Sequence, residues 1–275
     1  MVDILIILLI SIPAGFLGSL TGLGGASIMI PVLVAVGVPI KYAIAAGMVT
    51  IIATSSGSAS SYVRERITNV RAAMYLEMFT ITGAIIGATI TSYIAPKLLY
   101  FFFAAFLLTS FYGIRGHLHE EIPTDVKQDN LAKWLGLEGS YYDQALGREI
   151  NYKMTKPALG GVGMLVAGLA AGMLGIGAGA FKVSIHELIL RMPSKVSSTT
   201  SNFIIGMTAL AGASVYFTSG LLFLGLAAPM AVGTTIGSLT GARILNRLSN
   251  RRVRLLFLVL VALLIIQMLY KGITA

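Results

Sequence analysis

Long stretches of apolar residues follow one another through most of this chain, and they constrain its fold more than any other feature. Most of them reach the roughly 20 residues that a helix needs to cross a bilayer. Only 11% of the 275 residues are charged, whereas soluble domains average about 25%. The sequence therefore predicts an all-α, polytopic membrane helical bundle. The apolar stretches cover residues 2–38, 43–63, 72–95, 98–114, 157–190, 196–217, 221–245 and 255–270.

The N-terminus, the cysteine content and the charge exclude several classes of protein. The first apolar run lacks a basic leading segment and a small-x-small cleavage site, so we expect it to be retained as a membrane segment. The absence of cysteine excludes disulfides, iron–sulfur clusters, thiolate metal sites and cysteine nucleophiles. The net charge of +9 is explained by the excess of Lys and Arg in cytoplasmic loops. We therefore expect no nucleic-acid partner.

The two halves of the chain repeat each other. Each half interrupts a long apolar run with a glycine motif, "GLGG" at residues 22–25 and "GIGAG" at residues 175–179. The separation between matching residues is 153 around these motifs and 154 after one inserted residue. This pattern indicates a tandem duplication, as in many transporters. The matching pairs are Gly15 and Gly168, Gly22 and Gly175, Gly24 and Gly177, Pro39 and Pro193, Lys41 and Lys195, Tyr62 and Tyr216, Gly83 and Gly237, and Gly87 and Gly241.

The distribution of basic residues predicts the orientation of the halves. If runs 2–38 and 157–190 double back at their glycines, 16 of the 20 Lys and Arg residues fall on one side, three on the other and Lys182 inside the membrane. If each run crosses once, the split is 10 against 9. Because basic residues concentrate in the cytoplasm, the first arrangement is favoured. The sequence predicts two inverted repeats, each with a glycine-broken helical hairpin, and both termini outside the cytoplasm.

The returning limbs of these hairpins are short. Residues 26–38 and 180–190 span only about 16 to 20 Å as helices, so we expect half-helices that begin at the glycine turns inside the membrane. The predicted organisation is a first membrane repeat over 1–115, a cytoplasmic linker over 116–156 and a second membrane repeat over 157–275. Aromatic and β-branched residues around a Leu-Gly turn in residues 140–153 favour a small β-hairpin within the linker.

The glycine turns are the first candidate binding site. A helix N-terminus presents unpaired N–H groups and the positive end of the helix dipole, and both favour an anion. The alternative is that these glycines only allow helices to pack closely. The candidate substrate-binding glycines are Gly22, Gly24, Gly25, Gly175, Gly177 and Gly179.

Lys182, three residues after the second motif, is the candidate cation for an anionic substrate, because an ammonium inside a bilayer is costly without a function. Its alternatives are to extend to the membrane surface or to pair with Glu187 or another carboxylate. Polar stretches in the following helices add uncharged donors, although such groups often bond to helix backbone instead. The uncharged candidates are Thr54, Ser55, Ser201 and Asn202.

Two titratable residues are candidates for coupling transport to protons. His186 lies one helical turn after Lys182 and so on the same face. Glu77 lies inside an apolar run, and for it an interfacial ion pair near Arg71 is the favoured alternative. The pair His117 and His119 lacks metal-ligand spacing. We expect no metal, no cofactor and no catalytic residue, and hence no enzyme.

These motifs resemble those of the TauE/SafE-type sulfite and organosulfonate exporters over nearly the whole chain. The first half matches in "GLGGASIMIPVLVAVGVPIKYAIAAGM", "ATSSG" and "TNVRAAMYLE", and the second in "GMLGIGAGAFKV", "MPSKV", "TTSNFIIGMTA" and "GSLTGAR". The linker "GSYYDQALGREINYK" is similar to that of one branch. The chain departs from the pattern at Ala178, where a third glycine is usual, at "KVSIHEL", where a proline is usual, and near Gly47 and Met48, where a small-x-Ser pattern is usual.

The resemblance implies a plasma-membrane secondary transporter that exports small sulfur-containing anions, such as sulfite, sulfoacetate or related organosulfonates, driven by an ion gradient. Its partners would be the anion, the lipid bilayer and protons for coupling. One alternative is an anion channel. Another is an accessory membrane subunit or sensor that works through residues 117–153.

Overall fold

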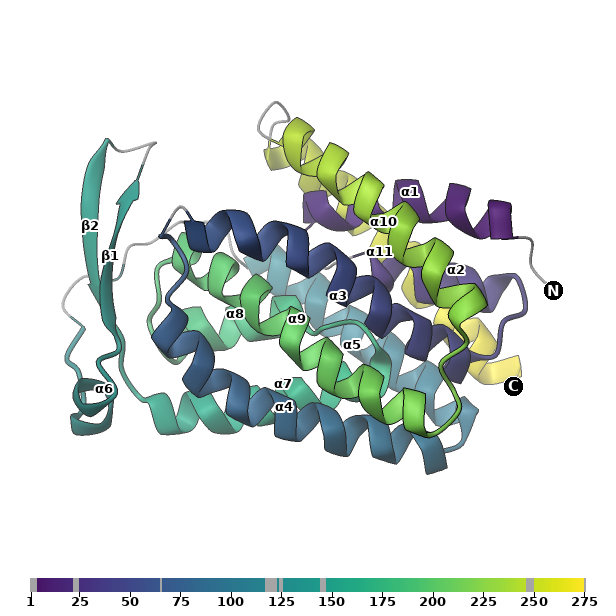
Figure 1. Ribbon diagram of the computed structural model, residues 1–275, viewed down its shortest axis with the longest axis horizontal. Coiled ribbons are helices and arrows are strands. Elements are labelled where there is room, and N and C mark those ends of the chain that lie inside the picture. Colours follow the sequence, from purple (N-terminus) through teal and green to yellow (C-terminus); the bar gives the residue numbers. More distant parts are fainter. Residues whose placement is uncertain are drawn as a thin grey trace.

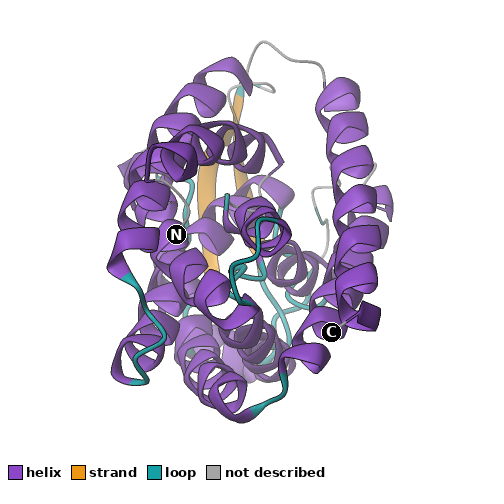
Figure 2. Cartoon of the chain, turned by 90° about the vertical axis from the view of Figure 1, so that its right-hand side faces the viewer, coloured by secondary structure: helices purple, strands orange, loops and turns teal. Residues whose placement is uncertain are grey.

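The computed structural model describes residues 4–21, 25–64, 66–116, 123, 126–143, 147–245 and 250–274. These residues form a bundle of helices with a two-stranded sheet at one end of its long axis (Figure 1). The predicted all-α helical bundle is confirmed. The start of α1 and the end of α11 lie at the opposite end from the sheet, as Figure 1 shows and as Figure 2, viewed from that end, confirms.

Each half of the chain contains the same succession of helices. The first of these is long, the second has only 10 residues, and three long helices follow. The short helices confirm the expected half-helices after the glycine turns. The first half consists of α1 (Ile4–Thr21), α2 (Ala26–Ala35), α3 (Ile40–Arg64), α4 (Val70–Tyr93) and α5 (Pro96–Gly116). The second half consists of α7 (Pro157–Leu174), α8 (Gly179–Leu188), α9 (Ser194–Thr218), α10 (Leu224–Leu245) and α11 (Asn250–Thr274).

The helices have the length and surface of a membrane bundle. Among the described residues, α4 and α7 are long and apolar enough to cross a bilayer, and α1, α2, α3, α5, α10 and α11 contain shorter apolar segments. Large apolar side chains are exposed along these helices, including Met78 of α4, Val162 of α7 and Ile266 of α11. Exposed apolar surface of this extent is what contact with lipid tails requires.

The chain doubles back at the second glycine motif. Gly175, Gly177 and Ala178 have positive φ angles, and Gly175 ends α7 in the left-handed conformation. The backbone N–H of Thr155, just before α7, donates to the carbonyl oxygen of Leu190, just after α8, at 3.2 Å. The short helix α8 therefore returns the chain to the end of the bundle where α7 began, as the sequence predicts.

Contacts at the two ends of the bundle agree with this doubling back. At one end, Lys41 Nζ donates to the Ser92 carbonyl oxygen at 2.9 Å, and the hydroxyls of Ser92 and Ser219 lie 3.5 Å apart. At the other, the N–H of Asn69 donates to Thr200 Oγ1 at 3.2 Å. If each apolar run crossed only once, residues 92 and 219 would lie on opposite sides of the membrane.

Helix packing is interchanged between the two halves. Helix α1 packs along α10 in the same way that α4 packs along α7, while α3 packs against α9 and α5 against α11. The backbone of Gly83 lies against Leu165 and Leu169, and that of Gly237 lies against Ile12 and Phe16, which occupy the matching positions. This exchange is what a two-fold relation between repeats produces. The inverted orientation in the membrane stays a prediction.

The linker contains the expected β-hairpin and rests on the end of the bundle. Strands β1 (Glu138–Asp143) and β2 (Arg148–Lys153) pair antiparallel. A short helix that the sequence did not indicate, α6 (Asn130–Trp134), precedes them, and the Asp129 side chain caps its N-terminus. Leu137, Tyr141 and Tyr152 join a buried cluster with Ala72 and Leu76 of α4, so the linker is packed onto the membrane helices.

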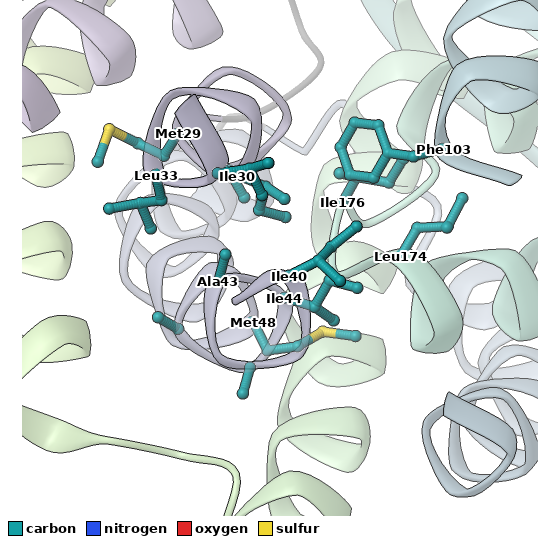
Figure 3. Close-up of a cluster of buried hydrophobic side chains, with 14 of the residues drawn as sticks. Met29, Ile30, Leu33, Ile40, Ala43, Ile44, Met48, Phe103, Leu174 and Ile176 are labelled. Atoms are coloured by element: carbon teal, nitrogen blue, oxygen red, sulfur yellow. The ribbon is translucent and has the colours of Figure 1, made fainter. Parts of the chain in front are cut away.

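The first half-helix, α2, lies in an apolar core. Its residues Met29, Ile30 and Leu33 belong to one buried cluster with Ala43 and Ile44 of α3, which lies beside α2 (Figure 3). The same cluster reaches Phe103 of α5 and Ile176 of the second glycine turn (Figure 3). Apolar packing against α3, α5 and the second glycine turn therefore holds the first half-helix in place.

Candidate functional site

Lys182 is completely buried near the middle of α8. Its ammonium donates a hydrogen bond to Thr208 Oγ1 of α9 at 3.0 Å, and the Thr208 hydroxyl in turn donates to the Ile204 carbonyl oxygen at 2.7 Å. The alternative that this side chain extends to the membrane surface is therefore wrong. The ammonium is kept inside the protein, which is where a positive charge could meet a substrate.

Glu77 of α4 is the carboxylate that acts on Lys182. The side chain is 6% exposed, its Oε1 atom is buried without a hydrogen-bond partner, and it interacts electrostatically with the Lys182 ammonium. The favoured interpretation from the sequence, an interfacial ion pair near Arg71, is wrong. Arg71 is exposed and lies beside Gly136 of the linker. A charge from each repeat thus contributes to one buried site.

His186 lies one turn further along α8 and is also fully buried. Its Nδ1 is 3.3 Å from the Ser197 carbonyl oxygen of α9, whereas Nε2 is buried without a partner. Lys182 and His186 both bond to α9, which confirms that they share a face of α8. Glu77 of α4 and the pair Lys182 and His186 of α8 are thus buried on two helices that both pack against α9.

The second glycine turn leads directly into this site. The Ile44 carbonyl oxygen lies 2.5 Å from the place where a Cβ on Gly175 would stand, and a Cβ on Gly177 would lie 2.9 Å from the Ile205 side chain. The turn therefore fits between α3 and α9 only because glycine has no side chain. Ala178, with φ of +51°, caps α8, although left-handed backbone is unfavourable for alanine.

The hydroxyl and amide candidates divide between the site and the helix backbone. Ser201 Oγ donates to the carbonyl oxygen of Gly179, the first residue of α8, at 3.4 Å. Ser55 Oγ donates across the helix crossing to the Asn202 carbonyl oxygen at 2.6 Å. Thr54 bonds to Thr50 within its own helix. The structure thus brings Ser201 to the start of α8 and uses Ser55 to join α3 to α9.

The first glycine turn is not an equal partner of the second. Gly22 and Gly24 lie outside the described residues, and Gly25 is buried beside Gly15 and Thr234. In the first half, the positions that match Lys182 are Ile28 and Met29. Both belong to the buried apolar cluster, in which Figure 3 shows Met29. The buried lysine and histidine therefore lie on the second half-helix, whereas the sequence analysis proposed binding glycines at both turns.

Thr208, the hydrogen-bond partner of the buried ammonium, was not predicted from the sequence. A signal was present, because Thr208 lies seven residues after Ser201, which is two turns along the same face of a helix. Its pairing with Lys182, 26 residues earlier, depends on how α8 and α9 pack. That packing has no local sequence signature.

Comparison with known proteins agrees with this architecture. The sequence matches the family described as Sulfite exporter TauE/SafE over residues 7–268. It is similar to the probable membrane transporter protein YunE of Bacillus subtilis (strain 168), with 24% identity over 276 residues and 98% of each chain covered. It is also similar to the probable membrane transporter protein YdhB of the same strain, with 26% identity over 249 residues and 90% of each chain covered. No solved structure matches the chain. This protein therefore belongs to the sulfite exporter TauE/SafE family.

Proposed function

We propose that this membrane transporter exports small sulfur-containing anions, such as sulfite, sulfoacetate or related organosulfonates, across the plasma membrane by means of an ion gradient. The observation that carries the proposal is the fully buried Lys182 ammonium on a half-helix that begins inside the bundle. A buried charge is expensive unless it is paired or functional. An anion is the ligand that would compensate it best.

The hydrogen-bonding capacity of Lys182 supports an anion with several oxygen atoms. An ammonium has three N–H donors, and the described structure places one of them on Thr208. Sulfite and sulfonate groups each present three oxygen acceptors. The remaining donors of Lys182 would bind such a group, and Ser201 and the backbone at the start of α8 would lie on its other side.

The glycine turn would let an anion approach the helix backbone. Gly177 and Gly179 lack side chains that would cover the first turn of α8, and the positive end of the α8 dipole favours negative charge there. Substrate sites of transporters with internal repeats commonly lie at such broken helices. In this proposal, Asn202 and Ser55 hold α3 against α9 behind the site, and Thr54 takes no part in binding.

Coupling to an ion gradient would use the titratable side chains at the site. Glu77 and His186 are the candidates, because each carries a buried polar atom without a partner. Alternating access would come from movement of one repeat relative to the other.

The direct test is transport by purified protein in proteoliposomes. Labelled sulfite, sulfoacetate and taurine would be offered with and without an imposed pH gradient. We expect saturable, gradient-dependent flux of at least one anion and its loss in Lys182→Met. The matched control is Lys97→Met, which removes an exposed lysine at the start of α5 and should leave flux unchanged.

Other outcomes would separate the alternatives. Flux that does not saturate and ignores the pH gradient would identify an anion channel. Absence of flux for all three compounds, in protein shown to be folded, would contradict the proposed substrate class. Loss of function on removal of residues 117–153, with the helical bundle still intact, would favour an accessory subunit or sensor.

A further inference from the structure

The charges of the buried site indicate how movement of the anion is coupled to movement of protons. This inference rests on the proposed function. Glu77 on α4 is 6% exposed, Lys182 on α8 is 0% exposed, and the two interact electrostatically. One comes from each repeat. With Lys182 charged and Glu77 ionised, the empty site has no net charge.

Binding of a monovalent anion at Lys182 would disturb this balance. The site would then hold two negative charges and one positive charge in a region of low dielectric constant, where an unpaired charge is strongly unfavourable. Uptake of one proton by Glu77 restores neutrality. The buried Oε1 atom has no hydrogen-bond partner to lose on protonation.

The proton count does not depend on where the proton sits in the empty site. An ion pair of a carboxylate with an ammonium holds one titratable proton, and so does a neutral pair of a carboxylic acid with an amine. The anion-bound site needs both the ammonium and the carboxylic acid, which together hold two. Binding therefore adds one proton in either case.

We propose that the substrate anion replaces the Glu77 carboxylate as the partner of Lys182, and that Glu77 takes up one proton from the same side, so that one monovalent anion and one proton cross together without net charge. After the site opens to the other side, the anion leaves, the O–H bond of Glu77 breaks, and the proton enters the solution on that side. The carboxylate then balances the charge of Lys182 again and the carrier returns empty. Because the anion and the proton move in the same direction, an exterior more alkaline than the cytoplasm drives export, and an acid exterior drives uptake.

The groups around Glu77 leave few other candidates for this proton. Helix α7, which packs along α4, has no titratable side chain between Pro157 and Leu174. Helix α9 presents the uncharged Thr200 and Thr208 to this region, with Lys195 at its first turn and Tyr216 near its far end. Arg71 and Tyr75 of α4 lie toward the linker, where Asp129 acts on Tyr75, and Glu187 follows His186 on α8. His186 is the titratable neighbour to be tested in parallel.

The experiment uses proteoliposomes and labelled methanesulfonate, a sulfonate that is monovalent at every pH used. When the outer solution is one pH unit more acidic than the vesicle interior, methanesulfonate should accumulate inside to at most about ten times its outer concentration, for one proton per anion. Transport on a supported membrane should produce no net current. A pH dye outside the vesicles should report one proton removed for each anion taken up. Flux of the anion without proton uptake, or with net current, would overturn the inference.

Variants locate the proton. Glu77→Gln should still exchange internal for external methanesulfonate but should lose acid-driven accumulation, so that the roughly tenfold ratio falls to one, and its net transport should carry current. The matched control is Glu138→Gln, which removes an exposed carboxylate of β1 and should keep coupling. Loss of accumulation in His186→Asn, with accumulation kept in Glu77→Gln, would place the proton on His186 instead. Retention of accumulation by Glu77→Gln would overturn the assignment to Glu77. Absence of anion flux in the unmodified protein would instead contradict the proposed function.

Discussion

The backbone of Gly168 in α7 lies directly against the carbonyl oxygen of Thr80 in α4. Gly15 and Thr234, the residues at the matching positions of the other halves, make the same contact between α1 and α10. Small residues allow membrane helices to approach this closely and to gain packing and weak polar contacts. The duplication therefore preserved a helix–helix contact as well as a sequence motif.

This contact predicts a pair of matched losses in stability. A Cβ added at Gly168 or at Gly15 would overlap the backbone of Thr80 or Thr234, so Gly168→Ala and Gly15→Ala should each cost about 1–3 kcal/mol despite the helix preference of alanine. Gly163→Ala is the control, because its added Cβ would meet only the Ile185 side chain, at 3.2 Å. Thermal unfolding in detergent would measure all three. Equal stability of the three variants would show that the close contact has no energetic weight.

The hydrogen bond between Asn69 and Tyr152 predicts how the linker is attached to the bundle. Asn69 Nδ2 donates to the Tyr152 hydroxyl at 3.0 Å, and Asn69 Oδ1 accepts from the Ala72 N–H at the start of α4. Tyr152→Phe should cost about 0.5–1.5 kcal/mol, and Asn69→Ala about 1 kcal/mol more, because the helix cap is also lost. A double-mutant cycle should show that the two losses overlap. Strictly additive losses would argue against the hydrogen bond. The exposed Tyr142→Phe is the control.

Tyr152 also predicts a change of stability at alkaline pH. Burial raises the pKa of its hydroxyl, and the hydrogen bond from Asn69 lowers the pKa by less. Between the ordinary tyrosine value, about 10, and the raised one, the folded protein binds more protons than the unfolded chain, so stability falls as pH rises. In Tyr152→Phe this part of the fall should be absent. Unfolding measured from about pH 9 to about pH 12 checks it, and parallel curves for the two proteins over this range would contradict the prediction.

Thr208 predicts a graded effect at the proposed binding site. Thr208→Val keeps the shape of the side chain and the Lys182 charge but removes the hydroxyl that positions the ammonium. Loss of this hydrogen bond should reduce the binding free energy of the anion by about 1 kcal/mol, which weakens anion affinity roughly fivefold. Lys182→Met should weaken it much more. Affinity would be read from the concentration dependence of flux. Thr82→Val, at an exposed position of α4, should leave it unchanged, and an equal effect of both variants would argue against the site.

The inverted arrangement predicts opposite accessibility of two exposed positions. The chain has no cysteine, so Tyr142→Cys in the linker and Ser219→Cys after α9 would each introduce a single labelling site. An impermeant reagent should reach position 219 only from outside the cell and position 142 only from the cytoplasm. Labelling of both from one side would contradict the inverted repeat. Asn69 lies at the linker end of the bundle, like Tyr142, but is unsuitable as a labelling position because it is buried.

The sequence alone predicted the features that depend on neighbouring residues. Hydrophobic runs of bilayer length predicted the long helices. The glycines at 175 and 177 predicted the turn, since the left-handed backbone there suits residues without a side chain. Aromatic and β-branched residues around Leu146 and Gly147 predicted the hairpin of β1 and β2. The fixed offset of 153 to 154 residues predicted that α1 corresponds to α7 and α4 to α10.

The tertiary structure decided which polar groups meet. It placed Glu77 with Lys182, 105 residues later in the chain, and it left Arg71 at the linker. In the folded protein, the hydroxyls of Thr54 and Ser55 donate hydrogen bonds to carbonyl oxygens of helix backbone. Helix α2 packs into an apolar core, whereas α8 carries the buried Lys182 and His186. Hydrophobicity and turn preference act between residues that are close in the chain. The partner of a buried charge is fixed by the rotation and crossing of helices that come from different repeats, so only the packed structure could reveal it.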